Sequence, residues 1–126
     1  MKDRLGGLHS AKTVLYSVDF AEIETLQHKG KCRETAQILS RAAKNVEAAG
    51  ADFIVLCTNT MHKIASDLES AVRIPLLHIA DATAREISAL GLRRIGLLVK
   101  EEDSPGPLFD TTRIHAEAAV DLALES

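Results

Sequence analysis

A cysteine followed by three small polar side chains comes directly after an apolar run. The run Phe53–Leu56 leads without a break into Cys57, Thr58, Asn59 and Thr60. A cysteine can exchange a proton between its thiol and thiolate forms, which suits acid–base chemistry. The hydroxyl and amide groups beside it, with the free N–H groups of a following helix, could hold a carboxylate near the sulfur and favour a thiolate. This arrangement predicts chemistry on a small carboxylate.

The same residues also have a purely structural interpretation. Cys57 could be a small buried hydrophobic side chain, and Asn59 or Thr60 could only cap a helix. The pattern alone favours this structural interpretation. The catalytic one therefore needs support from elsewhere in the chain.

Composition limits the class of protein. The chain has 126 residues, 46% of them hydrophobic and 26% charged, as expected of one soluble globular domain over residues 1–126. A net charge of −3 with 3% aromatic residues argues against a nucleic-acid partner. The apolar stretches are far shorter than the roughly twenty residues of a membrane span. The two cysteines form no short-spaced framework and no secretory leader is seen, which predicts a cytoplasmic location.

Strand and helix patterns alternate along the sequence. Strands are expected at residues 13–18, 53–57, 76–79 and 95–99. Helices are expected at residues 33–49, 61–72, 81–90 and 111–125. The alternation predicts an α/β fold, a doubly wound three-layer domain with a parallel sheet and right-handed crossovers.

Several residues mark the expected ends of these helices. Gly50 and Gly91 are placed to end two helices, and Asp81 to begin the one at residues 81–90. Asp110 or Thr111 can cap the last helix, which is expected to be mostly buried. A charged stretch with two prolines, residues 100–107, is expected to be a loop.

The sequence around the cysteine resembles a known family. Residues 55–63 and 78–83 are similar to the first lobe of the aspartate/glutamate racemases, which are cofactor-independent, and a broad-specificity subgroup is the nearest match. The resemblance runs from Leu5 to Arg94 and again from Pro107 to the C-terminus. It implies that residues 1–99 correspond to one lobe of a two-lobed racemase, and residues 100–126 to a loop and a C-terminal return helix.

The resemblance also implies a mechanism and a site. In that family two cysteines, one from each lobe, remove and return the Cα proton of an amino acid from opposite faces. By resemblance Cys57 is the first acid/base of this isomerase, Thr58, Asn59 and Thr60 hold the substrate carboxylate, and Gln27 lines the pocket. The implied partner is a small amino acid, and no metal or pyridoxal cofactor is implied.

The sequence departs from the family in two places. Members begin with an extra strand and a G-G-M-S loop, whereas this chain starts just before Leu5. Members also carry a second lobe with a G-C-T-E stretch, whereas here residues 92–94 precede the strand expected at 95–99. We hypothesise that an internal deletion fused two copies of this strand, so that half a site remains. The alternatives are a non-catalytic remnant that binds small carboxylates and a truncated product without function. Loss of the first strand would expose backbone groups and apolar faces of its neighbours, so self-association is expected.

Other chemistry-bearing residues have weaker support. Cys32 lies in a polar run and is interpreted as an incidental thiol, although its basic neighbours leave a reactive role open. His62 is expected to be solvated, with orientation of the thiol or substrate binding as the alternative, and His78 is expected in the core. Cys57, His62 and His78 include no close ligand pair, so a metal site is not expected.

Overall fold

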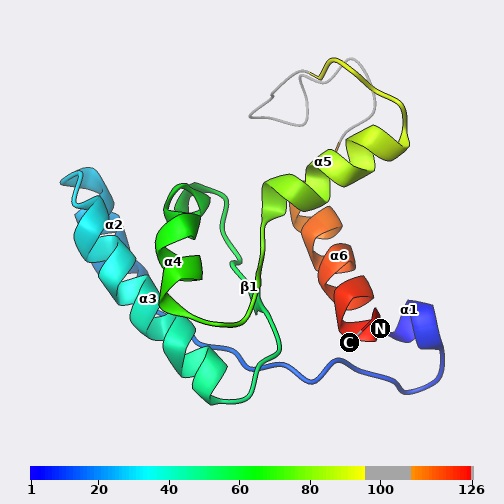
Figure 1. The fold of residues 1–126 in the computed structure, drawn as a ribbon, viewed down its shortest axis with the longest axis horizontal. Coiled ribbons are helices and arrows are strands. Elements are labelled where there is room, and N and C mark those ends of the chain that lie inside the picture. Colours follow the sequence, from blue (N-terminus) through cyan, green and yellow to red (C-terminus); the bar gives the residue numbers. More distant parts are fainter. Residues whose placement is uncertain (96–108, 126) are drawn as a thin grey trace. The chain divides into compact units, whose positions relative to one another are not determined.

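A computed structural model describes residues 1–95 and 109–125 of the chain (Figure 1). It divides into two compact units, Met1–Leu77 and His78–Ser126. The single domain expected over residues 1–126 stays a prediction. No helix of the described ranges is long and apolar enough to cross a membrane.

The first unit contains a short parallel sheet. Strand β1 (Ile54–Val55) pairs with β2 (Leu76–Leu77), and Ile54 lies opposite Leu76. The Ile54 N–H donates to the carbonyl of Pro75 at 2.9 Å. The apolar run at residues 53–57 therefore contains a strand with a parallel partner, shorter than predicted, and the α/β class is confirmed. Two strands are too few to define a doubly wound order.

Three helices precede β1 along the chain of the first unit. After a single turn, α1 (Lys2–Leu5), come α2 (Phe20–His28) and the long α3 (Cys32–Ala48). Helix α3 confirms the helix predicted at residues 33–49. Gly50 follows its C-terminal cap with φ of +88°, a backbone conformation that favours glycine, so the predicted terminator is also confirmed.

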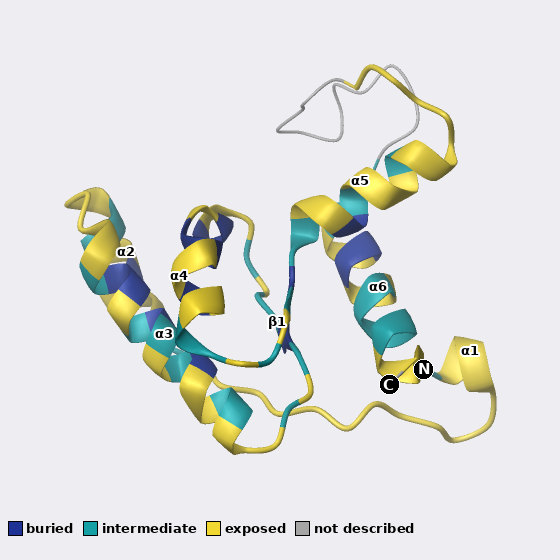
Figure 2. Cartoon of the chain, in the orientation of Figure 1, coloured by how far each residue is buried: buried dark blue, intermediate teal, exposed yellow. Residues whose placement is uncertain are grey.

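The segment after β1 begins as a tight helix and continues as a normal one. Residues Thr60–Ile64 form the 3₁₀ helix η1, and Ala65–Ala71 form α4. These two elements bring apolar side chains against α2 and α3, and the buried residues of this core are shown in Figure 2. The core consists of Ile23, Ala36, Leu39, Met61, Ile64 and Leu68. The helix predicted at residues 61–72 is thereby confirmed, with its first turn wound more tightly than expected.

The second unit is a pair of packed helices, α5 (Ile79–Ala89) and α6 (Thr111–Glu125). The strand expected at residues 76–79 ends at Leu77, because His78 caps α5: its Nδ1 accepts from the N–H of Ala80 at 3.1 Å. The prediction that Asp81 begins this helix is therefore wrong, since Asp81 lies in its first turn. Gly91 follows the helix with φ of +68° and confirms its predicted end.

Helix α6 begins as predicted but is less buried than expected. The Asp110 side chain accepts from the N–H groups of Thr112 and Arg113 at 3.0 and 3.1 Å, as a capping residue does. Only Ile114 and His115 of the helix are buried. The prediction of a mostly buried helix is wrong, because among the described residues α5 is its one extensive packing partner.

The segment before α2 does not form the strand expected at residues 13–18. These residues are not paired with any strand of the described chain. Leu15 is 88% exposed, and only Val18 packs against the core. A strand needs a hydrogen-bonding neighbour, so β propensity without a partner leaves this segment irregular. The predicted loop at 100–107, and all of the predicted strand at 95–99 except Ile95, lie outside the described residues.

Candidate functional site

Cys57 lies where the chain leaves β1. The Leu56 carbonyl accepts a hydrogen bond from the Thr58 N–H at 2.8 Å, which makes Cys57 the central residue of a three-residue turn. Its thiol lies 3.7 Å from the Val55 carbonyl oxygen. Cys57 is exposed. The interpretation of Cys57 as a small buried hydrophobic residue is therefore wrong, and its thiol is accessible to a ligand.

The three polar residues after Cys57 continue this turn. Thr58 is half-buried, whereas Asn59 and Thr60 are exposed. Asn59 precedes η1 but makes no side-chain capping hydrogen bond. The interpretation of Asn59 as a side-chain cap is therefore wrong, and its amide remains available. We call Cys57–Thr60 the thiol turn.

The backbone donors of the thiol turn are only partly used. The His62 N–H donates to the Asn59 carbonyl at 3.3 Å, which closes the first turn of η1. Within residues 1–95 and 109–125, no group accepts from the N–H of Asn59, Thr60 or Met61. Such donors retain the capacity to bind an oxyanion close to the sulfur.

Gln27 approaches the thiol turn from another helix. It lies in the last turn of α2, is half-buried, and its Nε2 donates to the Met61 sulfur at 3.5 Å. Helix α2 is absent from the helices expected from sequence, although the sequence carries a signal for it. Asp19 accepts from the Ala21 N–H at 3.1 Å, and Glu22 follows three residues later, which is a helix-start pattern.

His62 lies in η1, two residues beyond the thiol turn, and is buried. It is 9% exposed, and its Nε2 lies 3.2 Å from the Leu56 carbonyl oxygen. The expectation of a solvated histidine is wrong, because η1 places this ring beside the core residues Met61 and Ile64. His78 is half-buried at the start of α5, so its assignment to the core is also wrong. In the described part of the chain no three His, Cys, Asp or Glu residues are grouped as metal ligands.

Cys32, the other thiol, has different surroundings. It is the exposed first residue of α3, and its N–H donates to Gly30 at 3.0 Å. The Thr35 N–H is likewise bonded, to Lys31 at 3.1 Å. The pKa of Glu34 is below its usual value, first because its own backbone N–H donates to it and then because Lys31 lies 3.2 Å away. The N–H groups of Cys32, Glu34 and Thr35 are therefore already bonded, unlike those of Asn59, Thr60 and Met61.

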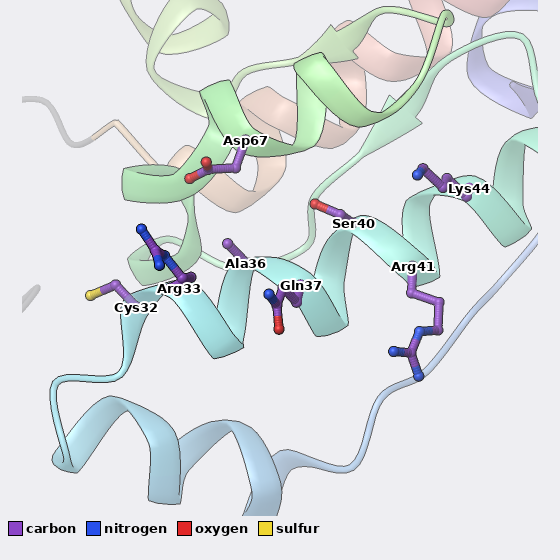
Figure 3. A pocket seen from close by; sticks show the side chains of 8 residues that line it. All are labelled: Cys32, Arg33, Ala36, Gln37, Ser40, Arg41, Lys44 and Asp67. Carbon is purple, nitrogen blue, oxygen red and sulfur yellow. The ribbon is translucent and has the colours of Figure 1, made fainter.

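A groove of about 790 Å³ runs along α3, but it contains none of the predicted site residues. Side chains of α3 and Asp67 of α4 line it (Figure 3). Arg33 points toward Asp67, whereas Gln37 and Arg41 point to the other side of α3. Because its polar side chains diverge, the groove does not resemble a site built around one ligand, and the thiol turn remains the candidate site.

Comparison with known proteins gives three consistent results. Residues 1–111 match the family model of the Asp/Glu/hydantoin racemases. Broad specificity amino-acid racemase RacX of Bacillus subtilis (strain 168) is 35% identical over 54 residues, a match that spans 43% of this chain and 24% of RacX. A crystal structure from Yersinia pestis, assigned as an Asp/Glu racemase, matches with a TM-score of 0.83 and 36% identity. That match covers 98% of this chain and 88% of the other, so the two chains are of similar length.

The predicted family and the α/β class are thus confirmed. The matched part of this chain is about a quarter of the length of RacX, at 24%. The second lobe and the internal deletion that would have removed it stay predictions. From the family model over most of its length and from its structural neighbour, the chain belongs to the Asp/Glu/hydantoin racemase family.

Proposed function

We propose that the chain acts on the Cα–H bond of small amino acids, as an amino-acid racemase does, with Cys57 as one acid/base. Thr58, Asn59 and Thr60 hold the substrate carboxylate, and Gln27, whose Nε2 donates to the sulfur of the next residue, Met61, contributes to the same site. Proton transfer between sulfur and carbon changes no other bond, so the step is balanced without a metal or pyridoxal cofactor.

One observation carries this proposal. The exposed Cys57 thiol lies in the same turn as three backbone N–H groups, those of Asn59, Thr60 and Met61, that no described residue uses. A carboxylate bound by these donors would place the adjacent Cα within reach of the sulfur. Oriented donors of this kind also stabilise the negative charge that develops when the Cα proton leaves.

A single thiol limits the reaction. The thiolate of Cys57 takes the Cα proton and can return it only to the same face, which gives exchange with solvent but no inversion. Inversion needs a second acid on the opposite face, and the sequence holds only one other cysteine, Cys32. We propose that a second copy of the chain supplies this acid through its own Cys57. Racemisation then depends on self-association.

The test is proton NMR of L-aspartate, L-glutamate and L-homoserine in D₂O with the purified chain, followed by chiral analysis. We expect the Cα–H signal to disappear with the intact chain and to persist with Cys57→Ser. Cys32→Ser is the matched control and should exchange at the rate of the intact chain. Equal exchange by Cys57→Ser and the intact chain would exclude Cys57 as the base.

The stereochemical result separates the alternatives. Exchange with inversion that rises with protein concentration supports a site completed by a second copy. Exchange without inversion leaves Cys57 as a lone base. Carboxylate binding without exchange, in protein that unfolds cooperatively, would instead favour a non-catalytic binding remnant.

A further inference from the structure

We propose that His62 is a positioning residue that fixes the thiol turn by donating a hydrogen bond from its Nε2–H to the Leu56 carbonyl. This inference rests on the proposed function, because it explains how Cys57 and its neighbouring donors are held in one arrangement. The Nε2 of His62 and the Leu56 oxygen are 3.2 Å apart, across six residues of chain. The bond therefore spans the whole thiol turn.

The Leu56 carbonyl is the point at which the turn is anchored. It accepts from the Thr58 N–H at 2.8 Å as well as from His62, so both lone pairs of the oxygen have donors. Cys57 lies between the acceptor, the Leu56 carbonyl, and the first donor, the Thr58 N–H. Rotation of the Leu56–Cys57 peptide would break both bonds and would reorient Cys57 relative to the rest of the thiol turn.

The other end of this bond is held by the core. His62 is in η1 between Met61 and Ile64, which are each 4% exposed and belong to the main core cluster. The ring is thus carried by a segment that cannot shift without disturbing the core. It connects this fixed segment to an exposed turn, which explains why a polar ring is buried at this position.

The geometry assigns a tautomer. A carbonyl oxygen only accepts hydrogen bonds, so Nε2 of His62 must carry a proton. A direct test follows from this assignment. Nitrogen-15 NMR of the intact chain, labelled at histidine, should show a protonated Nε2 for His62. An unprotonated Nε2 would overturn the proposal, and this measurement needs no variant and no turnover.

Alkylation of Cys57 tests the function of the bond. In a Cys32→Ser background, Cys57 is the only thiol, and its reaction is measured with iodoacetate and iodoacetamide. Iodoacetate carries a carboxylate that the thiol turn can hold, whereas iodoacetamide is neutral. We expect the ratio of the two rates to exceed the ratio for a free small thiol by about tenfold, the effect of one charge-assisted hydrogen bond.

Two substitutions of His62 separate positioning from packing. His62→Leu fills the buried position with an apolar side chain but removes the donor, so the ratio should fall to the value of a free thiol. His62→Gln retains an N–H donor of similar reach and should keep most of the ratio. The exposed His28 of α2 provides the control, and His28→Leu should leave the ratio unchanged.

The ratio of the alkylation rates with iodoacetate and iodoacetamide distinguishes this inference from the proposed function itself. If His62→Leu changed the rates with both reagents by the same factor and left their ratio high, the positioning role would be contradicted. An equal ratio in His62→Leu, His62→Gln and the parent would also contradict it. If the intact chain shows the raised ratio and the His62 dependence but no Cα exchange, the turn is held as inferred and only the proposed reaction fails.

Discussion

Two apolar runs in the first unit have similar sequences and different structures. Residues 53–57 contain the strand β1 and lead into the thiol turn, whereas residues 13–18 are irregular. Ile54 in the first run is 7% exposed, and Leu15 in the second is 88% exposed. Both runs are rich in residues that favour strands, so propensity does not explain the difference.

The difference lies in what each run contacts. β1 has a parallel partner in β2 and packs against α3. Residues 13–17 have neither a strand partner in the described chain nor a place in the core, where only Val18 packs. A strand is stabilised by its neighbours, and the thiol turn is therefore ordered because the strand before it and the core after it are both fixed.

The largest effect on stability is expected at Ile54, in the buried strand β1. Ile54→Ala should lower the free energy of unfolding by about 2–5 kcal/mol, because a buried branched side chain is removed and a cavity remains. Urea denaturation followed by circular dichroism measures this change. A loss below about 1 kcal/mol would show that β1 is not part of the cooperative core.

A smaller effect is expected at the boundary between residues 13–18 and the core. Asp19→Ala removes the acceptor for the Ala21 N–H at the start of α2 and should cost about 1 kcal/mol of unfolding free energy. The same denaturation experiment measures it. Asp52→Ala, at an exposed position just before β1, is the matched control and should change stability by less than about 0.5 kcal/mol.

The smallest effect is expected in the irregular segment. Leu15→Ala should change the free energy of unfolding by less than about 0.5 kcal/mol, because its side chain already faces solvent. Backbone amides of residues 13–17 should also exchange with D₂O far faster than the Ile54 amide, which is bonded to Pro75. A destabilisation by more than about 1 kcal/mol would mean that this segment pairs as a strand in solution, for example in a self-associated form.

Most helices and the position of the candidate site could be predicted from sequence. Periodic apolar residues identified α3, α4, α5 and α6, and the apolar run before Cys57 identified β1. Helix α2 was missed because its apolar face is small, with Ile23 as its one buried residue. Its start signal, Asp19 followed by Glu22, was present but not accompanied by a long periodic pattern.

The site could be located from sequence, but its geometry could not. The order Cys57, Thr58, Asn59, Thr60 already indicates a thiol beside carboxylate-binding groups, and the family resemblance assigns their roles. The contacts of Gln27 with Met61, and of His62 with Leu56, join residues that local patterns treat as separate. These contacts depend on how η1 is wound and where it meets the core.

The sequence alone therefore determined the family and the α/β class and proposed the residues of the candidate site, because periodicity and motif order are local properties. The tertiary structure decided which apolar run becomes a strand and that Cys57 is exposed. It also decided that His62 is buried with its Nε2 beside the Leu56 carbonyl. Burial and pairing are properties of the neighbours that the fold brings together. A residue's own type and position in the chain do not specify those neighbours.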